Sequence, residues 1–175
     1  MRKAIAVTIL AISFCYCFGQ STNSKPVEPT VIGDVFLLDS STQTLKPLPS
    51  EPWQETTTHM GALSGGYMHS VQLPGNQSTF RLRAEEKAEF VFKVGNPENV
   101  TLYPCVEKKH QRLANYAKDQ LHANWTADKT SIAGLPVEIT QFGDSSFKLA
   151  PKAPLGPGEY VISTSTKMFS FGIDK

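Results

Sequence analysis

Serine and histidine side chains are the first candidates for chemistry in this sequence of 175 residues. Ser64 and His69 lie close together along the chain, and a hydrolase uses these residue types as nucleophile and general base. His69 can act as a base only if the fold places a nucleophile within hydrogen-bond reach and an orienting carboxylate behind the ring. The stretch Leu-Ser-Gly-Gly at 63–66 lacks the Gly-x-Ser-x-Gly pattern of a hydrolase elbow. We therefore interpret it as a glycine-rich turn.

A second serine motif runs from Ser145 to Lys148 and has the Ser-x-x-Lys spacing of penicillin-recognising enzymes. The Ser-Asp-Asn and Lys-Thr-Gly elements that accompany it in those enzymes are missing from the sequence. The motif also falls where we expect a β-turn. We interpret the spacing as a coincidence.

Metal binding requires three or four converging ligands. The chain offers six candidates, which are His59, His69, Cys105, Glu107, His110 and His122. Glu107 and His110 have the i, i+3 spacing of carboxylate–histidine sites, but such sites use two copies of the motif and this chain has one. The sequence also lacks a phosphate-binding Gly-Lys-Ser/Thr loop and a dinucleotide fingerprint. We therefore expect no metal, no cofactor and no catalytic residues.

Aromatic and asparagine residues suggest weaker possibilities. Trp53 and Trp125 could form a platform for a sugar or a peptide, although tryptophan more often packs in or beside a core. Asn76, Asn99 and Asn124 each begin an Asn-x-Ser/Thr sequon, which would carry a glycan in a eukaryotic secretory pathway and would be inert in a bacterium.

The start of the chain has the features of an export signal. Met1-Arg2-Lys3 precedes an apolar run from Ala4 to about Phe18, which is shorter than the roughly 20 residues of a spanning helix. We expect cleavage after Gly19, so that residues 1–19 are a signal peptide, 20–30 a flexible polar leader and 31–175 a single domain. An uncleaved anchor and lipid attachment at Cys15 or Cys17 are the alternatives. The expected location is the periplasm or the extracellular space.

Cys105 is the only cysteine that such cleavage would leave, so an intramolecular disulfide is not expected. Burial as a small hydrophobic residue is our first interpretation, and pairing with another chain or a reactive thiol are the alternatives.

Cleavage after Gly19 leaves 15 basic against 16 acidic residues and a formal charge of −1. This balance argues against nucleic-acid binding, which needs a concentrated basic face.

Short apolar runs and period-two alternation indicate a β-rich domain. We expect strands at 31–38, 45–48, 67–73, 80–84, 90–94, 100–103, 135–142, 146–149, 160–163 and 168–173. We interpret 49–66 as either a long loop or an irregular edge segment, and expect Pro104 to shorten its strand or place it on an edge. Leu113, Tyr116, Ala117 and Leu121 recur at helical spacing and predict one short helix at 110–123. The predicted fold is an all-β, antiparallel, immunoglobulin-like sandwich with that helix.

The C-terminal part of the chain carries a resemblance. The stretches Phe-Gly-Asp-Ser-Ser-Phe-Lys-Leu-Ala-Pro at 142–151, Pro-Leu-x-Pro-Gly-Glu-Tyr at 154–160 and Phe-Ser-Phe-Gly-Ile-Asp at 169–174 resemble the ends of a group of uncharacterised exported bacterial proteins. The resemblance covers about a quarter of the chain and implies a bacterial envelope or periplasmic setting. It implies no activity and no site residues.

Together these observations predict an exported, non-catalytic binding or structural module of the bacterial cell envelope. Recognition would use loops at one end of the sandwich or strand addition at an exposed edge. The partner would be an envelope protein or a glycan, and neither nucleic acid binding nor a stable membrane span is expected. A small extracytoplasmic hydrolase, with its site formed by Trp53–His69 and Cys105–His122, is one alternative. A barrel that binds an apolar ligand is the other.

Overall fold

The computed structural model describes residues 26–60, 65–121 and 127–175. These residues form β-strands and one 3-10 turn, η1 (Pro97–Asn99). The strands are β1 (Val35–Asp39), β2 (Thr44–Pro47), β3 (Ser50–Glu51), β4 (Gln54–His59), β5 (Tyr67–Pro74), β6 (Arg81–Leu82), β7 (Phe90–Phe92), β8 (Thr101–Lys108), β9 (Gln111–Leu121), β10 (Ala127–Ser131), β11 (Val137–Phe142), β12 (Ser146–Pro151), β13 (Gly158–Ser163) and β14 (Met168–Ile173).

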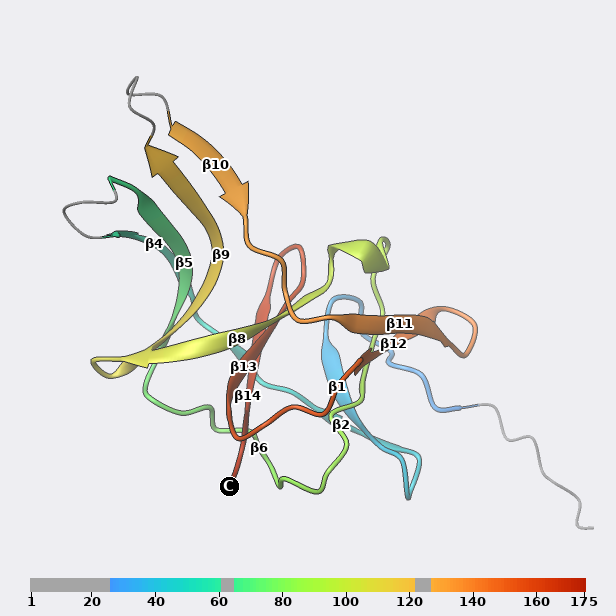
Figure 1. Ribbon diagram of the computed structural model, residues 1–175. Coiled ribbons are helices and arrows are strands. Elements are labelled where there is room, and N and C mark those ends of the chain that lie inside the picture. Colours follow the sequence, from blue (N-terminus) through green and yellow to red (C-terminus); the bar gives the residue numbers. More distant parts are fainter. Residues whose placement is uncertain (1–25, 61–64, 122–126) are drawn as a thin grey trace, which may run out of the picture.

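Two sheets form a sandwich, which confirms the predicted all-β fold (Figure 1). The smaller sheet has the order β11-β12-β7-β1-β2, and the larger has the order β3-β14-β13-β8-β9-β5-β4, with β10 beside β9 and β6 beside β14. The strand pairs are antiparallel apart from the short pair of β6 with β14. Among the described residues no strand pairing joins the two sheets, so they do not close into a barrel.

Seven strands follow the order of a constant-type immunoglobulin sandwich. In that nomenclature β1, β7, β12 and β11 correspond to A, B, E and D, while β8, β13 and β14 correspond to C, F and G. The hydroxyl of Tyr160, at the start of β13, donates a hydrogen bond of 2.8 Å to the carbonyl of Gly156. This is the tyrosine corner of such sandwiches, in which the tyrosine fixes the turn before strand F.

The hydrophobic core lies between the two sheets. Strands β7 and β14 contribute a fully buried set of phenylalanines, and the rings of Phe90 and Phe171 lie 4.8 Å apart. Val35 and Leu149 from the smaller sheet and Ile162 from the larger sheet complete the centre of this layer with no exposed surface. The apolar side chains that alternate along the strands thus point into this core, as the period-two pattern predicts.

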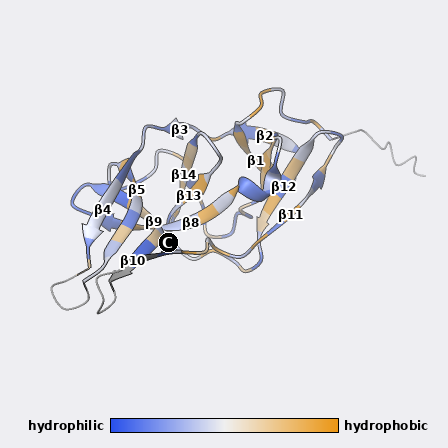
Figure 2. Ribbon diagram, turned by 90° about the horizontal axis from the view of Figure 1, so that it is seen from above, coloured by the Kyte–Doolittle hydropathy of each residue, from blue (hydrophilic) through white to orange (hydrophobic). Residues whose placement is uncertain are grey.

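The remaining strands come from two insertions into the immunoglobulin order. One insertion, between β1 and β7, contains β4 and β5, and the other, between β8 and β11, contains β9 and β10. β5 pairs with β9, so the four strands form a continuous sheet in the order β4-β5-β9-β10. We call this sheet the blade; it projects from the sandwich and is largely hydrophilic (Figures 1 and 2).

The helix predicted at 110–123 is wrong, because 111–121 is the long strand β9. Leu113 and Ala114 are both buried although they point to opposite faces, and Ala114 belongs to an apolar cluster with Val71, Val161 and Met168. The register between β5 and β9 shifts at His69 and Ser70, which leaves Tyr116 as an extra residue next to Ala117. Burial on both faces, together with this bulge, spaces the apolar residues at intervals of three and four, as in a helix. Pairing with the neighbouring strands nevertheless makes the segment a strand.

Other predictions are refined. The segment 49–66 contains β3 and β4, which favours the edge-segment interpretation over a long loop. β6 is shorter than the strand expected at 80–84. Pro104 does not shorten β8. The amide of Leu135 donates to the carbonyl of Leu102, so the backbone groups of Leu102 point away from β13. Pro104 lies two residues further along the strand, and its backbone groups therefore point the same way. Pro104 therefore removes no β8–β13 hydrogen bond.

The packed part of the chain begins before Val31. The carboxylate of Glu28 accepts hydrogen bonds from the amides of Asp144 and Ser145 and from the hydroxyls of Ser145 and Ser146. These bonds lower the pKa of Glu28 from 4.5 to about 2. Pro29 is buried beside it. Within the described residues there is no helix whose length and hydrophobicity would suit a membrane crossing.

Candidate functional site

One face of the blade continues onto the outer face of the β8–β13–β14 sheet. Cross-strand register places Glu55, Thr57 and His59 of β4 beside Val71, His69 and Tyr67 of β5 on this face. The other members come from β9, β10 and the sandwich strands. We call the surface the pocket face, and it consists of Glu55, Thr57, His59, Tyr67, His69, Val71, Tyr103, Ala114, Tyr116, Asp119, Lys129, Val161, Ser163 and Met168.

An aromatic pocket of about 180 Å³ lies on the pocket face at the base of the blade. Its floor is apolar, with Val71, Val161 and Met168 buried beneath the opening. Its rim includes Tyr103, Tyr116, Glu55, Ser163 and the ring of Trp53. Trp53 is 41% exposed although it is the largest side-chain type, so much of its ring is available to a ligand.

Charges at the rim concentrate around Tyr116. Partial burial, together with the charge of Glu55 and the hydrogen bond that the phenol donates to its carboxylate, raises the pKa of Tyr116. On another side the ammonium nitrogen of Lys129 lies 5.7 Å from the centre of the Tyr116 ring, within the range of a cation–π contact. These contacts hold the Tyr116 ring at the edge of the pocket. Glu55 is the acidic residue among those that line the pocket.

A chain of three hydrogen-bonded side chains lies further out on the blade. The hydroxyl of Thr57 is 3.3 Å from Nδ1 of His69, and Nε2 of His69 is 2.8 Å from Oδ2 of Asp119. The other oxygen of Asp119, Oδ1, is buried and finds no hydrogen-bond partner within the described part of the chain. The arrangement provides His69 with the orienting carboxylate that base catalysis needs. It also fixes the ring, because both nitrogens are engaged.

The two segments expected to form a hydrolase site therefore meet, although through different residues. His69 is joined by Asp119 and Thr57, which the sequence did not single out, whereas Ser64 and His122 lie outside the described residues. Glu107 and His110 are exposed near the β8–β9 turn, and His59 contacts the ring of Tyr67 edge-on at 5.2 Å. Across the described ranges, no group of three His, Cys, Asp or Glu side chains could hold a metal ion.

Cys105 lies partly buried on β8, beside the apolar cluster under the pocket. Burial raises the pKa of its thiol from 9.0 to about 12. The thiol is therefore protonated at neutral pH, which disfavours a nucleophilic role. Of the sequon asparagines, Asn76 is exposed in a loop and Asn99 is exposed at the end of η1, while Asn124 lies outside the described residues, as does Trp125.

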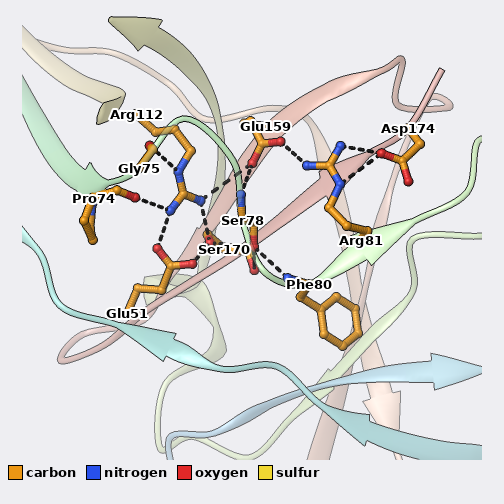
Figure 3. Close-up of polar contacts among 10 residues, drawn as sticks. All are labelled: Glu51, Pro74, Gly75, Ser78, Phe80, Arg81, Arg112, Glu159, Ser170 and Asp174. Carbon is orange, nitrogen blue, oxygen red and sulfur yellow. Dashed lines mark hydrogen bonds and ion pairs between the residues drawn. The ribbon is translucent and has the colours of Figure 1, made fainter. Parts of the chain in front are cut away.

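An ion-pair network with a buried centre at Arg112 and Glu159 anchors the blade to the sandwich (Figure 3). Arg112 of β9 is 1% exposed; it bonds Glu51 and lies 3.6 Å from Glu159 of β13. Glu159 also pairs with Arg81, whose guanidinium bonds Asp174 near the C-terminus at 2.6 Å. The network thus connects β3, β9, β13 and the end of the chain.

Serine and backbone groups satisfy the rest of the network. Arg112 donates to the hydroxyl of Ser170 at 2.8 Å and to the carbonyls of Pro74 and Gly75, at 2.8 and 3.2 Å. The amide of Ser78 donates to Glu159 at 2.7 Å. A charge buried in this way is stable only when it is paired and hydrogen-bonded. The network therefore fixes the orientation of β9 and, with it, of the pocket.

Sequence reasoning identified Trp53 and His69 but missed Glu55, Asp119 and Tyr116. The alternation Glu-x-Thr-x-His at 55–59 was a usable signal, because period two places these polar side chains on one face of a strand. Asp119 and Tyr116 gave no such signal, since their places depend on the pairing of β5 with β9.

Comparison with models of protein families, with curated proteins and with solved structures finds no match for this chain. The geometry of the pocket face is therefore the guide to function.

Proposed function

We propose that the protein is an exported, non-catalytic binding module of the cell envelope. Its ligand is an apolar side chain of a partner protein, inserted into the aromatic pocket between the blade and the sandwich. The observation that carries this proposal is the exposed ring of Trp53 above an apolar floor. A partner protein would bury these surfaces, and rigid aromatic residues contribute strongly to such interfaces.

The composition of the pocket favours a protein side chain over a sugar. Valine, alanine and methionine make up much of the lining, and the polar groups are confined to the rim. An apolar floor offers few partners for sugar hydroxyls, whereas a methionine adapts to the shape of an inserted side chain. Glu55 at the rim provides an acceptor that orients the entering chain.

Site-specific crosslinking in cells tests the proposal. A photoreactive amino acid at Ser163, on the pocket rim, should capture a defined envelope protein that the same probe at Thr44 on the distant strand β2 does not capture. The purified partner should then bind the Trp53→Ala variant at least about tenfold more weakly, the loss expected of a central aromatic anchor. Tyr67→Ala, which truncates an exposed aromatic residue away from the pocket, is the matched control. Equal affinity of the Trp53→Ala and unaltered proteins would refute the pocket as the binding site.

Export is part of the proposal and has its own measurement. Expression in a bacterium followed by fractionation and N-terminal sequencing should give a processed protein that begins at Gln20. A protein retained in the cytoplasm with Met1 intact would contradict it.

Hydrolysis is the alternative function, and the Thr57–His69–Asp119 chain is the observation that favours it. In that case Thr57 would be the nucleophile and His69 its base. The purified protein should then turn over a chromogenic ester, and His69→Ala should abolish the turnover. If the unaltered protein hydrolyses the ester no faster than its His69→Ala variant, the hydrolase alternative is excluded.

A further inference from the structure

Strand β4 is an open edge of the larger sheet. It pairs with β5 along its whole length without a bulge, and within the described residues no strand covers its other side. Open edges carry unpaired backbone groups that can bind another strand. The exposed segment Gln54–His59 also carries neither the lysine nor the proline that commonly protects such an edge.

The backbone groups on this open side belong to Glu55, Thr57 and His59. The amide of Met60 donates to the carbonyl of Gly66, so even-numbered residues of β4 direct their backbone groups toward β5. The odd-numbered residues therefore direct theirs outward, and their side chains lie on the pocket face.

Two copies of β4 are complementary to each other in one antiparallel register. When Thr57 faces Thr57 of a second copy, Glu55 faces His59 and His59 faces Glu55, so all three outward-facing residues find partners. The same register places Thr56 opposite Thr58 on the other face, where threonine pairs are favourable. Shifting the register by one pair leaves an outward residue unmatched and separates the carboxylate from the imidazole.

Other edges in the described part of the chain lack this combination. β2 contains Lys46 and Pro47, β10 contains Lys129, and β3 is only two residues long. β11 is as long as β4 but has Glu138 as its only charged residue, so self-pairing offers it no opposite charge.

We propose that the protein forms a symmetric dimer through antiparallel pairing of β4 with β4 of a second copy. The larger sheets of the two copies then become one continuous sheet, with both aromatic pockets on the same face. His59 of the second copy lies next to Glu55 at the pocket rim, so each copy completes the rim of the other. This proposal depends on the edge of β4 and does not require the partner protein proposed above.

Proline at the centre of the edge tests the backbone pairing. Thr57→Pro removes one outward amide but no β4–β5 hydrogen bond, because Thr57 directs its backbone away from β5. Sedimentation velocity of the mature chain over roughly a hundredfold range of concentration should show a monomer–dimer equilibrium, since self-association depends on concentration. Thr57→Pro should weaken it at least about tenfold. Thr57→Val, which also loses the hydroxyl but keeps the amide, should still dimerise, and circular dichroism should show that both variants are folded.

Substitutions of opposite charge at His59 test the register. His59→Glu places carboxylates opposite each other twice in the dimer and should weaken it several-fold, whereas His59→Arg should strengthen it by a similar factor because its guanidinium faces Glu55. In a Cys105→Ala background, Thr57→Cys should form a disulfide-linked dimer under mild oxidation, and Glu55→Cys alone should not. A chain that is monomeric at every concentration, or a dimer that Thr57→Pro leaves unchanged, overturns the proposal. Equal effects of the two His59 substitutions overturn the register.

Discussion

The thiol of Cys105 shows how burial sets the chemistry of a single residue. Because its pKa is raised to about 12, the thiolate fraction at a given pH below 9 is roughly a thousandfold lower than for an ordinary thiol. We expect iodoacetamide at pH 8 to label Cys105 at least about a hundredfold more slowly in the folded protein than in urea. Mass spectrometry of timed samples measures both rates. Similar rates in the two states would mean that the thiol is accessible and reactive.

Glu28 provides the residue-scale test at acidic pH. Its folded pKa, about 2, lies below the ordinary 4.5, so Glu28 stabilises the fold above pH 4.5 and this contribution disappears as the pH falls toward 2. We expect NMR to show its carboxyl titrating near pH 2. In Glu28→Gln, the amides of Asp144 and Ser145 should exchange with solvent faster at neutral pH, while amides of β13 keep their protection. Titration near 4.5 would show that the contact is absent in solution.

At the scale of elements, the close approach of β5 to β9 depends on a glycine. A Cβ built on Gly66 would overlap the backbone carbonyl of Asp119, which cannot move aside easily because β10 pairs with β9 there. We therefore expect Gly66→Ala to separate the two strands and to break the contact between His69 and Asp119. The signature would be faster exchange of the Ala117 and Asp119 amides and a shifted His69 imidazole resonance.

Gly95→Ala is the matched control for this prediction. A Cβ at Gly95 meets no atom within 4 Å, so this variant should leave the same amides and the His69 resonance unchanged. If Gly66→Ala behaved like Gly95→Ala, the strands would have to be further apart in solution than in the structure.

At the scale of the whole molecule, the Arg112 network decides whether the blade and sandwich act as one unit. Arg112→Met removes the cation that faces Glu51 and Glu159, and breaking a buried pair in this way costs about 3–5 kcal/mol of the free energy of unfolding. Urea denaturation followed by fluorescence measures the loss. A triple variant that also carries Glu51→Gln and Glu159→Gln should recover part of the lost free energy of unfolding, because no unpaired carboxylate remains. Full stability of Arg112→Met would show that the network contributes nothing to docking.

Much of the sandwich could be predicted from the sequence, because its strands are specified locally. Alternating residues such as Phe90 and Phe92, or Phe169 and Phe171, determine which side of a strand packs into the core between the sheets. Turn residues around Asp144 determine where strands end. These signals need no knowledge of distant partners, and they led to the correct fold class and most of the strands. Export and the envelope setting are also predictions from sequence, and they await the measurements above.

Only the tertiary structure decided the blade, the pocket and the network. β9 carries apolar residues on both faces and a bulge, so its local pattern imitates a helix until β5 and β8 pair with it. Asp119 reaches His69 across fifty positions of sequence, and Arg112 reaches Glu51 across sixty-one. Such contacts depend on which strands pair and in what register, and pairing between distant segments leaves no periodic trace in a single chain.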